Sequence, residues 1–125
     1  MRHEASRKSW IANREFNMKY EEQRIAIAKA CGWIKTSEPE EVYGVTFPWI
    51  SDDGESYKYL PDYLYDLNAM HEAEKHCIYI GEEIDTDLIA EYLMNVVIAA
   101  PPGRSQSASP RQRAEALLRT IGKWR

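Results

Sequence analysis

The segment from Leu60 to Cys77, LPDYLYDLNAMHEAEKHC, joins an extended start to an amphipathic helix, and the rest of the chain has to cover that helix. Pro61 disfavours helical geometry at Leu60 and has no backbone donor, so the segment is predicted to begin extended. Asp66 is the predicted N-cap of the helix. The apolar positions recur at three- and four-residue steps, which places them on one stripe: Leu67, Met70, Ala73 and Cys77. A stripe of this kind needs a partner surface.

A first helix is predicted from Tyr20 to Cys31. Acidic residues lie in its first turn and Lys29 in its last, as the helix dipole favours, and Gly32 is placed to end it in a left-handed conformation. The predicted buried stripe consists of Ile25, Ala28 and Cys31, with Ile27 at its edge.

Two more helices are predicted in the C-terminal half. Asp85 or Thr86 caps a helix to about Val97, in which apolar pairs recur every four residues: Leu88/Ile89, Tyr92/Leu93 and Val96/Val97. After a loop rich in proline and serine, Ser109 and Pro110 begin the last helix, and Gln112 occupies the capping-box position. The predicted apolar stripe of this helix is Ala114, Leu117, Leu118 and Ile121. Four basic residues are predicted on its opposite side: Arg111, Arg113, Arg119 and Lys123.

Between residues 33 and 59 the pattern changes from helical to β. Residues 36–40 are a predicted polar turn, and residues 41–49 a predicted strand with four candidate core residues: Val42, Val45, Phe47 and Trp49. Residues 51–54 predict a tight turn, and residues 57–59 a third strand that pairs back. For residues 78–80, a short strand and a turn both remain open. The elements together predict an α+β fold, in which a small antiparallel sheet packs with three to four helices in a sandwich-like arrangement.

Length and composition indicate one globular domain. The chain has 125 residues, 44% of them hydrophobic and 29% charged, which is enough apolar material for a core without disulfides. We expect a basic N-terminal extension over residues 1–19 and a single domain over residues 20–125; one hypothesis is that translation of the natural gene begins at Met18. No apolar run approaches the roughly 20 residues of a membrane span, and residues 1–17 lack the apolar core of a signal peptide. A cytoplasmic location is therefore predicted, with no membrane partner.

Charge is distributed unevenly along the chain. Residues 1–19 hold five basic and two acidic groups, residues 20–98 hold five and seventeen, and residues 99–125 hold six and one. One interpretation is that the basic ends stay near the acidic body and keep the protein in solution. The other is that the basic C-terminal helix forms a contact for phosphate or for an acidic partner.

The motifs that would carry catalysis or bind a metal are missing. His71 and His76 are five residues apart, about 140° around a helix, so both cannot easily reach one metal ion. The six glycines form no phosphate-binding loop. Cys31 and Cys77 each fall on a predicted buried stripe, where a thiol acts as a small hydrophobe, and a structural disulfide is not expected in the cytoplasm. We therefore predict no catalytic residue, no metal and no cofactor.

Three ordered segments carry a resemblance to a known family: EEQRIAIAKACGW, LPDYLYDLNAMHEAEKHC and QRAEALLRTIGKW. Together they resemble the phage ABA sandwich domain, which is found in small phage and prophage proteins of largely unknown function. The resemblance covers about three quarters of the chain, from Tyr20 to Trp124, and does not extend to the N-terminal extension or to the segment Cys77 to Asp85. It implies an α+β sandwich and a phage setting in a bacterial host, and it supplies no catalytic residue.

Aromatic residues crowd the junction between the predicted sheet and the central helix: Trp49, Tyr57, Tyr59, Tyr63 and Tyr65. Tyrosine is favoured at interfaces, because it combines a large rigid area with a polar tip. The alternative is that these residues serve the core and the strands. Tyr59 and Tyr63 are predicted to point inward, which leaves Trp49, Tyr57 and Tyr65 as candidate ligand- or partner-binding residues.

Two functional hypotheses follow, and an enzyme ranks behind both. The preferred one is a non-catalytic phage protein that captures a host protein or a small ligand, for example in counter-defence. If the ligand is a nucleotide, Arg111 and Arg113 at a helix N-terminus would bind its phosphates. The second hypothesis is an accessory or regulatory protein that self-associates into a homo-oligomer or contacts nucleic acid weakly. The acidic balance argues against nucleic acid as a strong partner.

Overall fold

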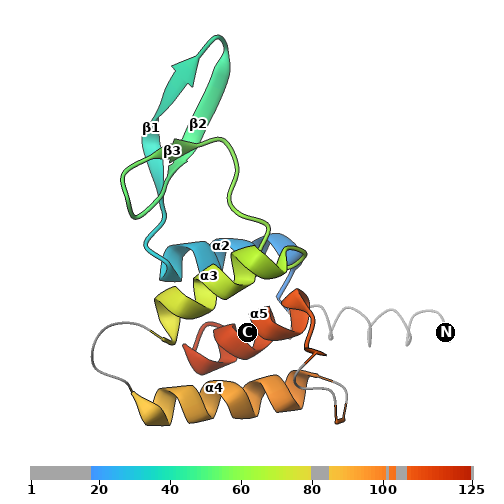
Figure 1. Cartoon of the computed structure of the whole chain (residues 1–125). Helices are drawn as coiled ribbons and strands as arrows, with labels where there is room; N and C mark the ends of the chain where they lie inside the picture. Colours follow the sequence, from blue (N-terminus) through green and yellow to red (C-terminus); the bar gives the residue numbers. More distant parts are fainter. Residues whose placement is uncertain (1–17, 80–84, 101, 104–106, 125) are drawn as a thin grey trace, which may run out of the picture.

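The computed structural model describes residues 18–79, 85–100, 102–103 and 107–124. Within them, four helices and a three-stranded antiparallel sheet confirm the predicted α+β class (Figure 1). The elements in chain order are α2 (Tyr20–Ala30), β1 (Ile34–Val42), β2 (Val45–Ile50), β3 (Ser56–Tyr57), α3 (Leu67–Cys77), α4 (Thr86–Ala99) and α5 (Pro110–Thr120). Of the predicted extension over residues 1–19, all but Met18 and Lys19 lies outside the described residues.

Helix α5 lies at the centre of the helical part and contacts α2, α3 and α4. It begins as predicted, because the side chain of Ser109 accepts from the backbone of Gln112 and the side chain of Gln112 accepts from the backbone of Ser109. Its buried residues are Ala114, Ala116, Leu117 and Leu118. The small alanines allow neighbouring helices to approach from more than one side, so α5 is buried beyond the single stripe that was predicted.

Helix α2 ends as predicted, with Gly32 at φ 91°. The order of its two isoleucines was predicted wrongly: Ile27 is fully buried and Ile25 is only half-buried. These residues lie two positions apart, about 200° around the helix, so they lie on opposite sides of it. The position of α5 and α3 decides between them, and the spacing within α2 does not contain that information.

Helix α3 has the predicted cap, since the carboxylate of Asp66 accepts from the backbone amides of Asn68 and Ala69. Met70 and Ala73 are buried as predicted, but Leu67 at the first turn is exposed. Ile78 follows α3 directly and is buried, and residues 78 and 79 form no strand. Residue 80 lies outside the described part of the chain.

The predicted strand over residues 41–49 is wrong, because the chain reverses direction in its middle. Tyr43 and Gly44 both have positive φ, at 52° and 79°, and form a two-residue turn that pairs Val42 with Val45. Two positive φ values match the right-handed twist of a hairpin. Residues 36–40, predicted as a turn, belong to β1, where the pairing is irregular between Lys35 and Glu40. The tight turn at residues 51–54 is confirmed by a hydrogen bond from the Gly54 amide to the Ser51 carbonyl.

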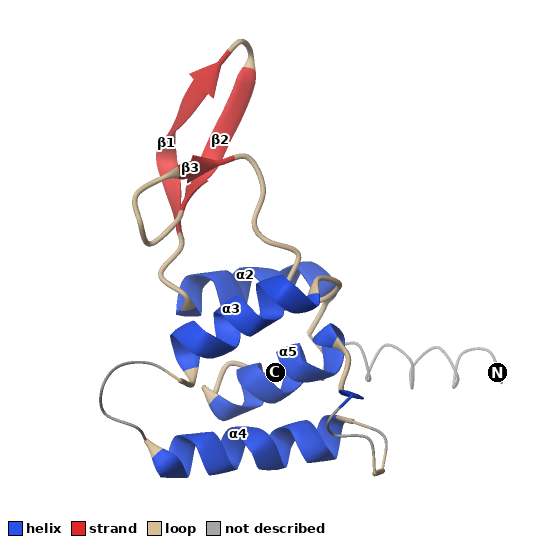
Figure 2. Ribbon diagram, viewed as in Figure 1, coloured by secondary structure: helices blue, strands red, loops and turns tan. Residues whose placement is uncertain are grey.

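The strand residues are less buried than predicted, because the β1–β2 hairpin projects away from the helices (Figure 2). Val42 is exposed, and Val45, Phe47 and Trp49 are half-buried. The sheet packs against the core at its base, through Trp49 of β2 and through Trp33, which directly precedes β1. The third strand, β3, is shorter than predicted and pairs with β2 at Trp49 and Ile50.

Among the described residues, no helix combines the length and apolar character that a membrane crossing requires.

Candidate functional site

The predicted aromatic residues Trp49 and Tyr57 come together on one face of the sheet. They are direct cross-strand partners, and Lys35 of β1 pairs with Trp49 from the other side. The Lys35 Nζ atom lies 5.7 Å from the centre of a Trp49 ring, and the rings of Trp33 and Tyr57 lie 5.1 Å apart. We call Trp49 and Tyr57, together with the neighbouring Lys35, the aromatic row. Tyr57 is 41% exposed, so the row offers an accessible contact surface.

Tyr65 is not part of the aromatic row. Its ring packs at 5.3 Å from the ring of Tyr20, at the start of α2, and the residue is exposed. Tyr63 is buried as predicted, whereas the inward orientation predicted for Tyr59 is wrong, because that residue is 67% exposed. The aromatic segment therefore separates into a surface on the sheet and a smaller pair beside α2.

Arg113 lies in a polar network inside the helical part. Its Nη1 atom donates to Oε2 of Glu74 at 2.9 Å, and Glu74 is only 4% exposed. The hydroxyl of Tyr92 donates to the same carboxylate oxygen, and Nδ1 of His71 lies 2.7 Å from Oε1. Burial and the bond to Glu74 raise the pKa of Tyr92, so its hydroxyl remains a donor. The network joins α3, α4 and α5.

The two arginines predicted to bind phosphate lie in different surroundings. The guanidinium of Arg113 is held by Glu74 and also donates from Nε to the Ala108 carbonyl at 3.3 Å. Arg111 is exposed and lines a pocket at the N-terminal end of α5. The prediction that Arg113 faces away from the apolar side of α5 is wrong, since it reaches a carboxylate buried between helices.

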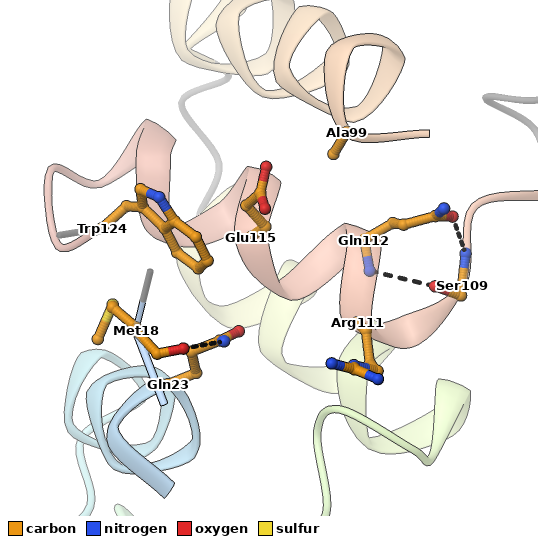
Figure 3. A pocket seen from close by; sticks show the side chains of 8 residues that line it. All are labelled: Met18, Gln23, Ala99, Ser109, Arg111, Gln112, Glu115 and Trp124. Carbon is orange, nitrogen blue, oxygen red and sulfur yellow. Dashed lines mark hydrogen bonds between the residues drawn. The ribbon is translucent and has the colours of Figure 1, made fainter. Parts of the chain in front are cut away.

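The pocket at the start of α5 has a volume of about 480 Å³ (Figure 3). In the view of Figure 3, Trp124 and Met18 lie on one side and Gln112 with Ser109 on the other. Gln23 donates from Nε2 to the Met18 carbonyl at 2.9 Å, and Gln112 is held in the capping box, so both side chains are already partly engaged. A pocket of this size accommodates a small molecule. Its charged lining residues are Arg111 and Glu115, of opposite sign.

The outer face of α4 is the largest departure from the predicted core. Four apolar residues on it are half exposed or more: Leu93 at 50%, Met94 at 61%, Val97 at 53% and Ile98 at 67%. We use the term outer face for these four residues. Tyr92 and Val96, on the other side of the helix, are buried, and α4 contacts α5. The predicted apolar pairs Tyr92/Leu93 and Val96/Val97 are therefore each divided between core and surface.

One signal in the sequence points to this outer face. No residue from 92 to 99 is charged, so the helix is apolar around most of its circumference after Glu91. A helix that is apolar on all sides is normally covered on all sides. Exposed apolar patches of this kind are typical of interaction surfaces.

Within the described residues, no group of three or more histidine, cysteine or acidic side chains is arranged to hold a metal ion. Comparison of the chain with models of known protein families, with curated proteins and with solved structures finds no match.

Proposed function

We propose that this chain is a non-catalytic binding protein of a phage or prophage, acting in the cytoplasm of the bacterial host, and that two copies associate through the outer face of α4. The observation that carries the self-association is the exposure of Leu93, Met94, Val97 and Ile98 side by side on one helix. The phage setting is supported by the three sequence segments that resemble the phage ABA sandwich domain.

The extent of the outer face fits the centre of a small interface. Four side chains of this size, each half exposed or more, present on the order of 400 Å² of apolar surface, as functional patches on monomers do. A stable interface buries roughly 800 Å² on each partner, and roughly 57% of that area is non-polar. Exposed neighbours on the same helix, such as Asp87 and Glu91, supply a polar rim.

A second copy of the chain is the occupant that this surface fits best. In a two-fold symmetric contact, the same patch occurs on both partners, so it must complement itself. An uncharged apolar face does so without matched charges, because it meets another uncharged apolar face. Asn95 lies on α4 too but does not contribute a polar group there, since its side chain donates to the Thr120 hydroxyl at 2.9 Å.

Association through α4 leaves the sheet accessible, whereas the pocket beside Arg111 is lined in part by Ala99 of α4. The sheet with its aromatic row lies at the end of the molecule opposite α4 (Figure 1). We propose that a host protein binds at Trp49 and Tyr57, while a small ligand would occupy the pocket beside Arg111. The ion pair between Arg113 and Glu74 favours the protein partner over a nucleotide, because it removes one of the two cations proposed for phosphate.

Native mass spectrometry of the protein purified from phage-expressing host cells tests this proposal. We expect a dimer, and we expect Ile98→Glu to raise its dissociation constant about 100-fold or more, because the two-fold axis brings two carboxylates into an apolar contact. Ile34→Glu is the matched control: Ile34 is similarly exposed, at 57%, but lies in β1. A monomer at all concentrations would contradict the self-association. A monomer with a retained small molecule would move the function to the pocket beside Arg111.

A further inference from the structure

Two cysteines that are distant in the sequence meet between α2 and α3. Cys31 follows the last residue of α2, and Cys77 is the last residue of α3. Their Sγ atoms are 3.8 Å apart, although 46 positions separate the two residues. Both are free thiols. The structure therefore holds a preformed dithiol at the C-terminal ends of α2 and α3.

The two thiols differ in their surroundings. Cys31 is buried and Cys77 is half-buried. The hydrogen bond between them lowers the pKa of Cys77, because the Cys31 thiol donates to the Cys77 thiolate. The same bond, together with burial, raises the pKa of Cys31. Cys77 is thus the sulfur that ionises first, and thiolates are the reactive form.

A pocket gives small molecules access to this site. It has a volume of about 280 Å³, and Cys31, Trp33, Tyr63 and His76 contribute to its lining. The pocket therefore opens beside Cys31, while Cys77, which does not line it, is itself partly exposed.

We propose that Cys31 and Cys77 are a modification site, at which a low-molecular-weight disulfide oxidises the pair to a reversible intramolecular disulfide joining α2 to α3. Bond formation requires the sulfurs to close from 3.8 Å to about 2.0 Å. Disulfides that form transiently in a reducing compartment are commonly regulatory.

The exchange takes place in two balanced steps. The Cys77 thiolate attacks one sulfur of the small disulfide, a sulfur–sulfur bond forms to Cys77, and the first small thiolate departs. Cys31 then loses its proton to the departed thiolate and attacks the Sγ atom of Cys77, which expels the second small thiolate. Two protein thiols are oxidised, and one small disulfide is reduced to two small thiols. With Cys77 in the mixed disulfide, the hydrogen bond that held the proton on Cys31 is gone.

Treatment of the full chain with oxidised glutathione tests the proposal. We expect intact-mass analysis to show a loss of about 2 Da without a glutathione adduct, and peptide mapping to link Cys31 to Cys77. The cross-link closes a loop of 46 positions, so the oxidised protein is expected to melt about 5 °C or more above the reduced one. Dithiothreitol should reverse both changes. A wild-type protein that accumulates glutathione adducts, or that does not react, would overturn the proposal.

The single variants identify the order of attack. Cys31→Ser lacks the second nucleophile, so we expect one glutathione to remain bound at Cys77. Cys77→Ser retains only the buried sulfur and is expected to react at least ~10-fold more slowly. Faster reaction at Cys31 than at Cys77 would contradict the assigned roles. If Cys31→Ser does not fold, Cys31→Ala provides the same readout, and the linked peptide of the wild-type protein decides the proposal in either case.

Discussion

Arg113→Ala is expected to lower the free energy of unfolding by about 3 kcal/mol or more, because it leaves the buried carboxylate of Glu74 without its cation. Arg111→Ala is the matched control, since Arg111 is an exposed arginine on the same helix. Its removal should change the free energy of unfolding by less than about 0.5 kcal/mol. Urea unfolding of the two variants and the wild-type protein measures the difference. Equal effects of the two substitutions would show that Arg113 is not held by Glu74.

Leu117→Ala is expected to lower the free energy of unfolding by about 2–5 kcal/mol, because Leu117 is fully buried on the central helix α5 and the substitution leaves a cavity. Leu93→Ala removes the same atoms from the outer face of α4, where the residue is 50% exposed. Measured on the monomer at low protein concentration, Leu93→Ala should lower the free energy of unfolding by less than about 1 kcal/mol. Thermal or urea unfolding at matched concentrations checks both values. A large loss for Leu93→Ala in the monomer would mean that the outer face belongs to the core of a single chain.

The elements whose signals are local were predicted well. The caps at Asp66, Asp85 and Ser109 act on amides two or three residues away, so a short stretch of sequence contains the complete interaction. The turn at residues 51–54 and the end of α2 at Gly32 are local in the same way.

The hairpin at Tyr43 and Gly44 was missed because its turn residues are unusual. Tyrosine seldom adopts a positive φ, and the common signals for a two-residue hairpin turn are Asn-Gly and Asp-Gly. Without the turn, residues 41–49 alternate well enough to resemble one strand. The same error placed Val42 and Val45 in the core, although the hairpin projects from the helical part.

Interactions between distant segments could not be predicted from spacing. Glu74 is buried because Tyr92 and Arg113, 18 and 39 residues away, both donate to it. Its own helix gives no sign of this, since glutamate on an amphipathic helix is normally exposed. The meeting of Cys31 with Cys77 is equally non-local. At the candidate site, Trp49 and Tyr57 are neighbours, as their grouping in the sequence predicts, but Tyr65, which was grouped with them, lies beside Tyr20 instead. The exposed outer face of α4 was not predicted.

Whether two copies meet at the outer face of α4 is tested most directly by backbone amide NMR spectra recorded over a range of protein concentrations. We predict that the signals of Leu93, Met94, Val97 and Ile98 shift or broaden as the concentration rises, because these residues enter the contact. The signal of Tyr43, fully exposed at the tip of the hairpin, should not change. Concentration-dependent changes confined to the hairpin, or no changes at all, would contradict association through α4.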